Sequence, residues 1–161
     1  MEGDILDTLF LFEGLTAEQR LILQPLFEPC DFYTDTVLFE QGDPADHLYV
    51  VVAGEVVVKF KPDDAPTLIV ARVLPGSIVG WSAVLGSRRY TSSAECSMYT
   101  QALRVRGDDL RRLCIQHPEM GVCVLDRLAG VIAERLHSTH AMVFSLLQLG
   151  MNKQSSERSG G

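Results

Sequence analysis

The spacing of hydrophobic residues changes twice along this chain of 161 residues. Up to about residue 27, apolar positions recur three and four apart, which is the pattern of helices. One helix is expected to begin at Thr16, because T-A-E-Q matches a capping box with Gln19 as the second partner. Between about residues 30 and 105 the pattern is that of short β-strands, and after Gly107 the helical spacing returns.

The middle segment consists of strand-like runs separated by turn residues. LYVVVAGEVVVKF contains two valine-rich strands with a hinge at Ala53-Gly54, and Gly42-Asp43-Pro44 marks a turn. Gly42 and Gly54 suit turns that need a positive φ. Short strands at this spacing predict a small all-β barrel or sandwich. Because the central strands are almost entirely valine, both of their faces are expected to be covered.

The last part of the chain predicts a short helix that ends before Pro118 and a long helix that continues to Gly150. Apolar residues along the long helix fall three or four apart, close to a heptad. A helix of about thirty residues is too long to bury on one small barrel. We therefore expect a homodimer through its far half, the alternative being packing on its own domain. The expected dimer contacts are Leu125, Leu128, Ile132, Leu136, Val143 and Leu146.

Together these patterns predict one domain over residues 1–150. The β region covers about 30–105 and the C-terminal helices about 108–149. Residues 151–161 are polar and aperiodic, and are expected to form a disordered tail. Apolar residues make up 47% of the chain, which is enough for a hydrophobic core.

Charge and cysteine usage narrow the function classes. With 14 basic and 21 acidic residues the net charge is −7, so direct binding of nucleic acid is not expected. The N-terminus MEGDILDTLF is acidic where a secretory signal needs positive charge, and no apolar run reaches the roughly 18 residues of a membrane span. The four cysteines are scattered and none lies in a CxxC pair. We expect a cytoplasmic protein with free thiols and no membrane contact.

Several segments carry a family resemblance. LFEGLTAEQRLILQPLFEP, VLFEQGDPADHLYVVVAGEVVV and VLPGSIVGWSAVLGSRRYTSSAEC, followed by a helix pair, resemble a cyclic nucleotide-binding domain of the bacterial catabolite-activator type. The resemblance implies a mainly β fold, a jelly-roll β-roll (a cupin-like double-stranded β-helix), with N-terminal helices, a long C-terminal helix and a ligand pocket inside the roll. Transcription factors of this family continue into a DNA-binding domain. Here about ten residues follow Gly150, so no such domain is expected.

The resemblance places ligand binding in the segment from Gly76 to Ser92. The family's phosphate cassette has a glutamate that accepts from the ribose hydroxyl and an arginine that contacts the cyclic phosphate. Here Trp81 stands in the glutamate position and cannot accept a hydrogen bond. Tyr90 occupies the arginine position by one alignment and Arg89 by an alignment shifted by one residue, with Arg88 a further candidate for contacting an anion. The expected ligand-binding residues are Gly80, Trp81, Ser82, Ala83, Arg89, Tyr90 and Thr91.

These observations favour a stand-alone regulatory module that senses a ligand and acts on an unidentified protein partner. The ligand is a cyclic nucleotide or another small anion. The alternative is a ligand-free protein-interaction or dimerisation module in which Trp81 fills the pocket. An enzyme is not expected, because a metal-dependent cupin needs several His or Glu ligands on its strands and only His47 lies in the β region. No cofactor and no metal are predicted.

Overall fold

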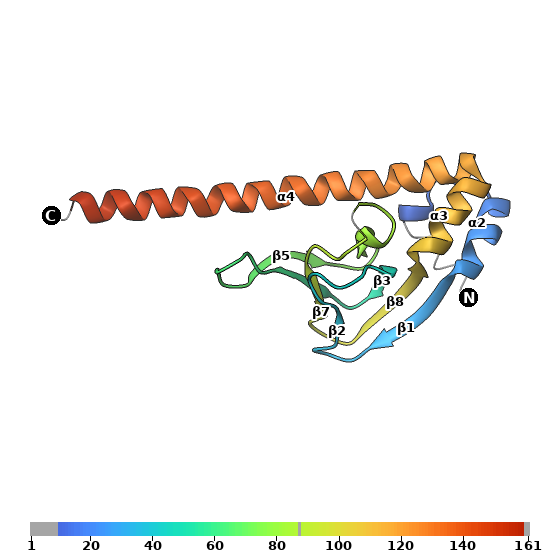
Figure 1. Cartoon of the computed structure of the whole chain (residues 1–161), viewed down its shortest axis with the longest axis horizontal. Coiled ribbons are helices and arrows are strands. Elements are labelled where there is room, and N and C mark those ends of the chain that lie inside the picture. Colours follow the sequence, from blue (N-terminus) through green and yellow to red (C-terminus); the bar gives the residue numbers. More distant parts are fainter. Residues whose placement is uncertain (1–9, 87, 160–161) are drawn as a thin grey trace.

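Eight strands form two antiparallel four-stranded sheets that fold into a roll, covered at one end by helices (Figure 1). The computed structural model describes residues 10–86 and 88–159; within these, the side chains of Phe10, 138–143, 146 and 150–159 are not described. One sheet has the order β1-β8-β3-β6 and the other β2-β7-β4-β5. The strands are β1 Phe27–Phe32, β2 Val37–Phe39, β3 His47–Ala53, β4 Val56–Phe60, β5 Leu68–Val73, β6 Ile78–Val79, β7 Ser93–Cys96 and β8 Thr100–Arg106. The prediction of a mainly β roll with flanking helices is confirmed.

The valine-rich strands are buried on both faces, as the sequence predicts. Along β3, Leu48 and Val50 pack into a core shared with the helices, whereas Tyr49 and Val51 pack into a second core between the two sheets. Successive side chains of a strand point to opposite faces, so one strand serves both cores. The β1-β8-β3-β6 sheet therefore lies between two apolar layers, and large side chains already occupy the interior of the roll.

Helical elements precede, interrupt and follow the roll. They are η1 Phe10–Phe12, α2 Ala17–Leu23, η2 Gln24–Leu26, η3 Trp81–Ala83, α3 Gly107–Gln116 and α4 Pro118–Ser159. The predicted capping box of α2 is confirmed: the Gln19 N–H donates to Thr16 Oγ1 at 3.1 Å, and the Thr16 N–H donates to Gln19 Oε1 at 2.9 Å. The turn glycines Gly42 and Gly54 adopt φ of 90° and 96°, also as predicted.

The long helix α4 extends beyond the end that Gly150 predicts. It continues for nine further residues to Ser159, through a segment predicted to be disordered. A glycine inside a helix costs only about 1 kcal/mol relative to alanine, and the residues that follow include good helix formers such as Lys153 and Gln154. Without a proline to stop it, the helix therefore passes through Gly150.

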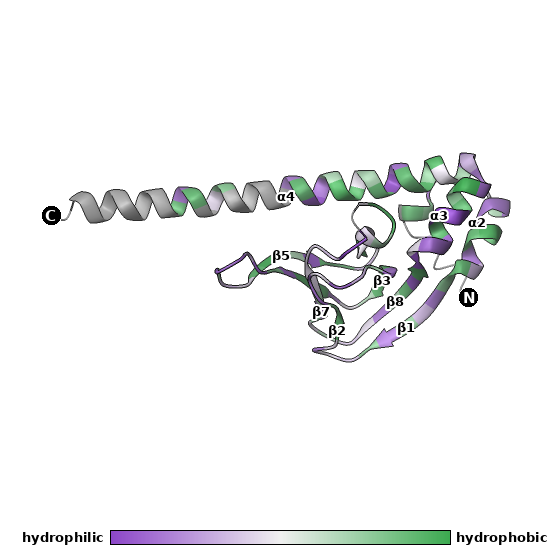
Figure 2. Cartoon of the chain, viewed as in Figure 1, coloured by the Kyte–Doolittle hydropathy of each residue, from purple (hydrophilic) through white to green (hydrophobic). Residues whose placement is uncertain are grey.

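The expected dimer contacts on α4 need a correction. Leu128 is 0% exposed and lies in the core of its own domain, and Leu125 packs against the same core. Leu128 is therefore not available to a second copy, whereas Leu125 is half-buried and keeps part of its surface exposed. Ile132 is half-buried and Leu136 is 53% exposed, while the side chains of Val143 and Leu146 lie outside the described residues. Hydrophobic segments recur along α4 beyond the helices that it packs against (Figure 2).

Candidate functional site

The cassette lies between β6 and β7, where the chain turns sharply before η3. Gly80 adopts φ 87° and precedes η3. A Cβ at Gly80 would lie 2.8 Å from the carbonyl oxygen of His47 and 3.3 Å from the ring of Tyr90. Only glycine allows both this backbone conformation and this approach to β3. The sequence therefore brings η3 and Tyr90 directly onto the inner face of the roll.

Tyr90 is fixed inside the roll by stacking and by two hydrogen bonds. Its ring centroid lies 3.7 Å from that of Phe39 with an interplanar angle of 10°, and the residue is 6% exposed. Its hydroxyl donates to the carbonyl oxygen of His47 at 2.7 Å and accepts from the N–H of His47 at 3.1 Å. Burial raises the pKa of Tyr90, so the phenol stays neutral at physiological pH. The pocket thus contains a neutral aromatic ring at this position.

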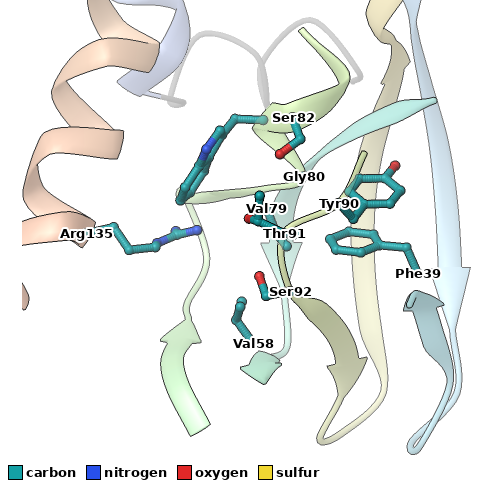
Figure 3. Close-up of a pocket in the computed structure, with 10 residues that line it drawn as sticks. Phe39, Val58, Val79, Gly80, Ser82, Tyr90, Thr91, Ser92 and Arg135 are labelled. Atoms are coloured by element: carbon teal, nitrogen blue, oxygen red, sulfur yellow. The ribbon is translucent and has the colours of Figure 1, made fainter. Parts of the chain in front are cut away.

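Arg135 reaches the cassette from α4. Its Nη2 donates to the carbonyl oxygen of Ile78 at 2.7 Å and to Ser77 Oγ at 3.2 Å. Its Cζ lies 4.8 Å from the ring centroid of Trp81, within the range of a cation–π contact. Burial lowers the pKa of Arg135 to about 10, which leaves the guanidinium charged at neutral pH. Figure 3 shows Arg135 pointing from α4 toward the pocket, with the stacked Phe39 and Tyr90 across from it.

The space left between these side chains is small. The cavity has a volume of about 30 Å³, room for no more than a few water molecules. Pockets for small ligands usually measure roughly 300–1,000 Å³. The lining residues are Phe39, Val58, Val79, Gly80, Trp81, Ser82, Tyr90, Thr91, Ser92 and Arg135. As folded here, the cavity is therefore too small for a nucleotide.

The structure brings some of the expected ligand-binding residues together and separates others. Five of them line the cavity: Gly80, Trp81, Ser82, Tyr90 and Thr91. Ala83 is fully buried at the end of η3, where its carbonyl oxygen lies against Gly107 at the start of α3. Arg89 is exposed and its Nη1 donates to the carbonyl oxygen of Gly42 at 2.9 Å, and Arg88 is also exposed. Of the two candidates for the arginine position, Tyr90 faces the cavity.

Sequence reasoning did not select Phe39, Val58, Val79, Ser92 or Arg135 for the pocket. The first four are ordinary strand or loop residues, and no local signal marks them as pocket residues. Arg135 has one available signal. It follows Leu128 and Val131 at steps of three and four, so helical periodicity places it on the face of α4 that packs on the domain. A charged residue in that position is unusual and indicates a specific partner.

Metal binding and membrane crossing each require a recognisable arrangement of residues. No group of three or more His, Cys, Asp or Glu side chains in the described part of the chain is arranged to hold a metal ion. Within the same residues, no helix combines the length and the apolar character that crossing a membrane requires.

Comparison with known proteins agrees with the fold. The family model of the cyclic nucleotide-binding domain matches residues 29–117, more than half of the chain, and the chain belongs to this family of regulatory modules. It is 25% identical over 144 residues to a CRP-like cAMP-activated global transcriptional regulator of Mycobacterium tuberculosis. That match covers 89% of this chain, and this chain spans 62% of the length of the regulator.

Two solved structures illustrate the range of proteins that share the fold. A cyclic nucleotide-binding domain from Methylobacillus flagellatus superposes with a TM-score of 0.78 at 24% identity, covering 88% of this chain and 80% of its own. The regulatory subunit of a cAMP-independent protein kinase A from Trypanosoma brucei superposes with a TM-score of 0.72 at 17% identity, covering 89% of this chain and 49% of its own. Both likenesses concern the fold alone.

Proposed function

We propose that this chain is a regulatory module of the cyclic nucleotide-binding fold in which its own side chains fill the nucleotide site. It works as a homodimer and passes the state of the cassette to a partner through α4, without responding to cAMP or cGMP. The observation that carries this proposal is the ring of Tyr90, stacked on Phe39 and bonded to the backbone of His47 in a cavity of about 30 Å³.

The chemistry of the two substituted positions supports the proposal. By the family resemblance, Trp81 stands where a glutamate would hold the ribose and Tyr90 where an arginine would hold the phosphate. Each lost hydrogen bond costs roughly 1–3 kcal/mol, and loss of a charged partner costs more. Micromolar binding corresponds to about 8 kcal/mol in total. Losing both contacts would therefore leave cyclic nucleotides with millimolar affinity at best.

The relatives are compatible with a member that does not depend on cAMP. The mycobacterial regulator is described as cAMP-activated, whereas the regulatory subunit from Trypanosoma brucei belongs to a kinase described as cAMP-independent. The fold therefore exists in regulatory proteins of both kinds.

A sensor of a different small ligand is the second candidate. The cavity is lined by the hydroxyls of Ser82, Thr91 and Ser92, together with the guanidinium of Arg135. These groups suit a small anion better than a nucleotide, because they provide hydrogen-bond donors without the volume for a base. A ligand of this kind would need Arg135 to move first.

A second apolar face on α4 supports the proposed dimer. Among the side chains of this helix that the structure describes, the exposed large hydrophobic ones are Val122, Leu136, Phe144, Leu147 and Leu149. With about 100° per residue, all but Leu149 fall within about 80° of one another, nearly opposite the face with Met120, Val124 and Leu128 that packs on the domain. A helix that is apolar on two sides needs a second partner, and a second copy of the same helix fits it.

The proposal is tested by thermal unfolding with 1 mM cAMP or cGMP. We expect no shift in the Tm of the natural chain. A site with a Kd of 10 µM would instead contribute about 2.7 kcal/mol at this concentration, and a rise of several degrees would overturn the proposal. The matched variant Trp81→Glu/Tyr90→Arg carries the two family side chains. We expect its Tm to rise with nucleotide, which would assign the exclusion to these two positions.

A further inference from the structure

One cationic side chain joins the long helix to the first part of the cassette segment, on both sides of Gly80. Arg135 lies on α4, more than forty residues from the nearest cassette residue in sequence. Its hydrogen bonds reach Ser77 and Ile78, where β6 begins, and its guanidinium lies over Trp81, where η3 begins. A single side chain therefore spans the turn that contains Gly80.

Two hydrogen bonds and one ring contact of Arg135 at the cassette are made with neutral groups. A carbonyl oxygen and a hydroxyl accept its hydrogen bonds, and the indole of Trp81 presents its face to the guanidinium. Arginine is suited to this position, because its planar group donates in its own plane while stacking on an aromatic face. A glutamate at position 81 would offer an ion pair in place of the stack. Trp81 and Arg135 thus form a matched pair.

The same turn of α4 carries one of the exposed apolar residues. Leu136 follows Arg135 directly and is 53% exposed on the side proposed for the dimer. Because adjacent residues of a rigid helix turn together, the contact that orients Arg135 toward the roll also sets the direction in which Leu136 points. The cassette and the proposed dimer face are therefore coupled within a single helical turn.

We propose that Arg135 takes the place of a bound ligand at the roll, and that its stack on Trp81 holds α4 against the cassette. Arg135 is a positioning residue here: it sets the direction of the proposed dimer face of α4, and no bound ligand is needed for this. This inference rests on the proposed function in that both take the cassette to be closed by the chain's own side chains.

The test uses the fluorescence of Trp81, which is the only tryptophan of the chain. Acrylamide quenching is compared in the natural chain, in Arg135→Met and in the control Arg72→Met, all without nucleotide. Arg72 is an exposed arginine of β5 that pairs with Glu55. We expect the quenching constant to rise about twofold or more in Arg135→Met and to stay unchanged in Arg72→Met. Equal constants in all three proteins would overturn the inference.

Hydrogen exchange gives a second readout on α4 itself. Amides of residues 131–137 are expected to exchange at least tenfold faster in Arg135→Met than in the natural chain, and unchanged exchange would contradict the inference. If Arg135→Met does not fold, Arg135→Lys gives the same comparison, because it keeps the charge and loses the planar stack. Both measurements are made without nucleotide. A Tm shift with cAMP would thus refute the proposed function while leaving the role of Arg135 to be judged separately.

Discussion

Tyr90 occupies the pocket, and both its aromatic ring and its hydroxyl make contacts there. The ring stacks on Phe39, and the hydroxyl both donates to and accepts from the backbone of His47. These contacts join the end of the cassette to β3, the strand that serves both hydrophobic cores. Tyr90 is therefore part of the folded core as well as of the candidate site.

Removal of the Tyr90 hydroxyl should destabilise the fold. Tyr90→Phe is expected to lower the free energy of unfolding by about 1–3 kcal/mol, because buried backbone groups of His47 lose a partner. Tyr33 is 81% exposed, so Tyr33→Phe provides a matched control that should change it by less than about 0.5 kcal/mol. Urea denaturation of the two variants measures the difference. Equal losses would show that the hydrogen bonds of Tyr90 carry little stability.

The sequence alone could locate the cassette but could not orient its arginines. Arg89 and Tyr90 are adjacent, and an extended chain sends adjacent side chains to opposite sides. The choice between them is made by backbone pairing with a distant turn: Arg89 bridges Pro44, and the Tyr90 N–H donates to the carbonyl oxygen of Asp43 at 2.9 Å. No local pattern encodes that register, so the sequence could not say which of the two side chains faces the cavity.

At the scale of elements, η3 and α3 meet at a backbone contact that leaves no room for a side chain. A Cβ at Gly107 would lie 1.9 Å from the carbonyl oxygen of Ala83. The N–H of Gly107 donates to the carbonyl oxygen of Asp46 at 2.9 Å, which satisfies one free donor at the start of α3 without a side-chain cap. Asp108 and Asp109 lie in the first turn of the helix.

Two glycines of the C-terminal helices should therefore respond in opposite ways to the same change. Gly107→Ala is expected to cost about 1–3 kcal/mol, because η3 and α3 must move apart. At Gly130, within α4, a Cβ meets no atom within 4 Å, so Gly130→Ala should stabilise the protein by about 0.5–1 kcal/mol. Thermal unfolding of both variants gives the signs. A Gly107→Ala variant as stable as the natural chain would contradict the close contact of η3 with α3.

The success of element prediction depended on how local each signal was. The capping box of α2 is contained in four residues, and it was predicted correctly. The heptad on α4 failed at Leu128, which is buried in its own domain, because the helix has two apolar faces and one predicted stripe included residues of both. Which face meets the domain depends on how the helix docks, and periodicity does not contain that information.

For the whole molecule, the exposed face of α4 determines the predicted assembly. Leu147 is 61% exposed on the proposed dimer face. Leu147→Glu places a charge in an apolar contact, and we therefore expect it to raise the dissociation constant of the dimer at least tenfold. Gln148→Glu adds the same charge to the next, differently directed residue and should leave the constant nearly unchanged. Analytical ultracentrifugation measures both. A natural chain that stays monomeric at every concentration would contradict the dimer.

The mainly β architecture with flanking helices followed from patterns distributed over the whole chain. Strand-forming valines, turn glycines and the change of period agreed with one another, and agreement across levels is what makes a fold predictable. The pocket volume was not accessible in this way, because it depends on where Phe39, Tyr90 and Arg135 meet, and these residues come from three separate elements. The sequence could predict a cassette, and only the packing could show that it is closed.

The length of α4 gives the contact at Arg135 a mechanical consequence. From Arg135 to Ser159 the helix runs for 24 residues, or about 36 Å at about 1.5 Å per residue. If α4 pivots at Arg135, a tilt of about 5° moves its far end by about 3 Å, by the geometry of a rigid rod of this length. In that case the helix amplifies a small movement at the contact of Arg135 with Trp81. A movement too small to open the pocket would then reorient the far half of α4.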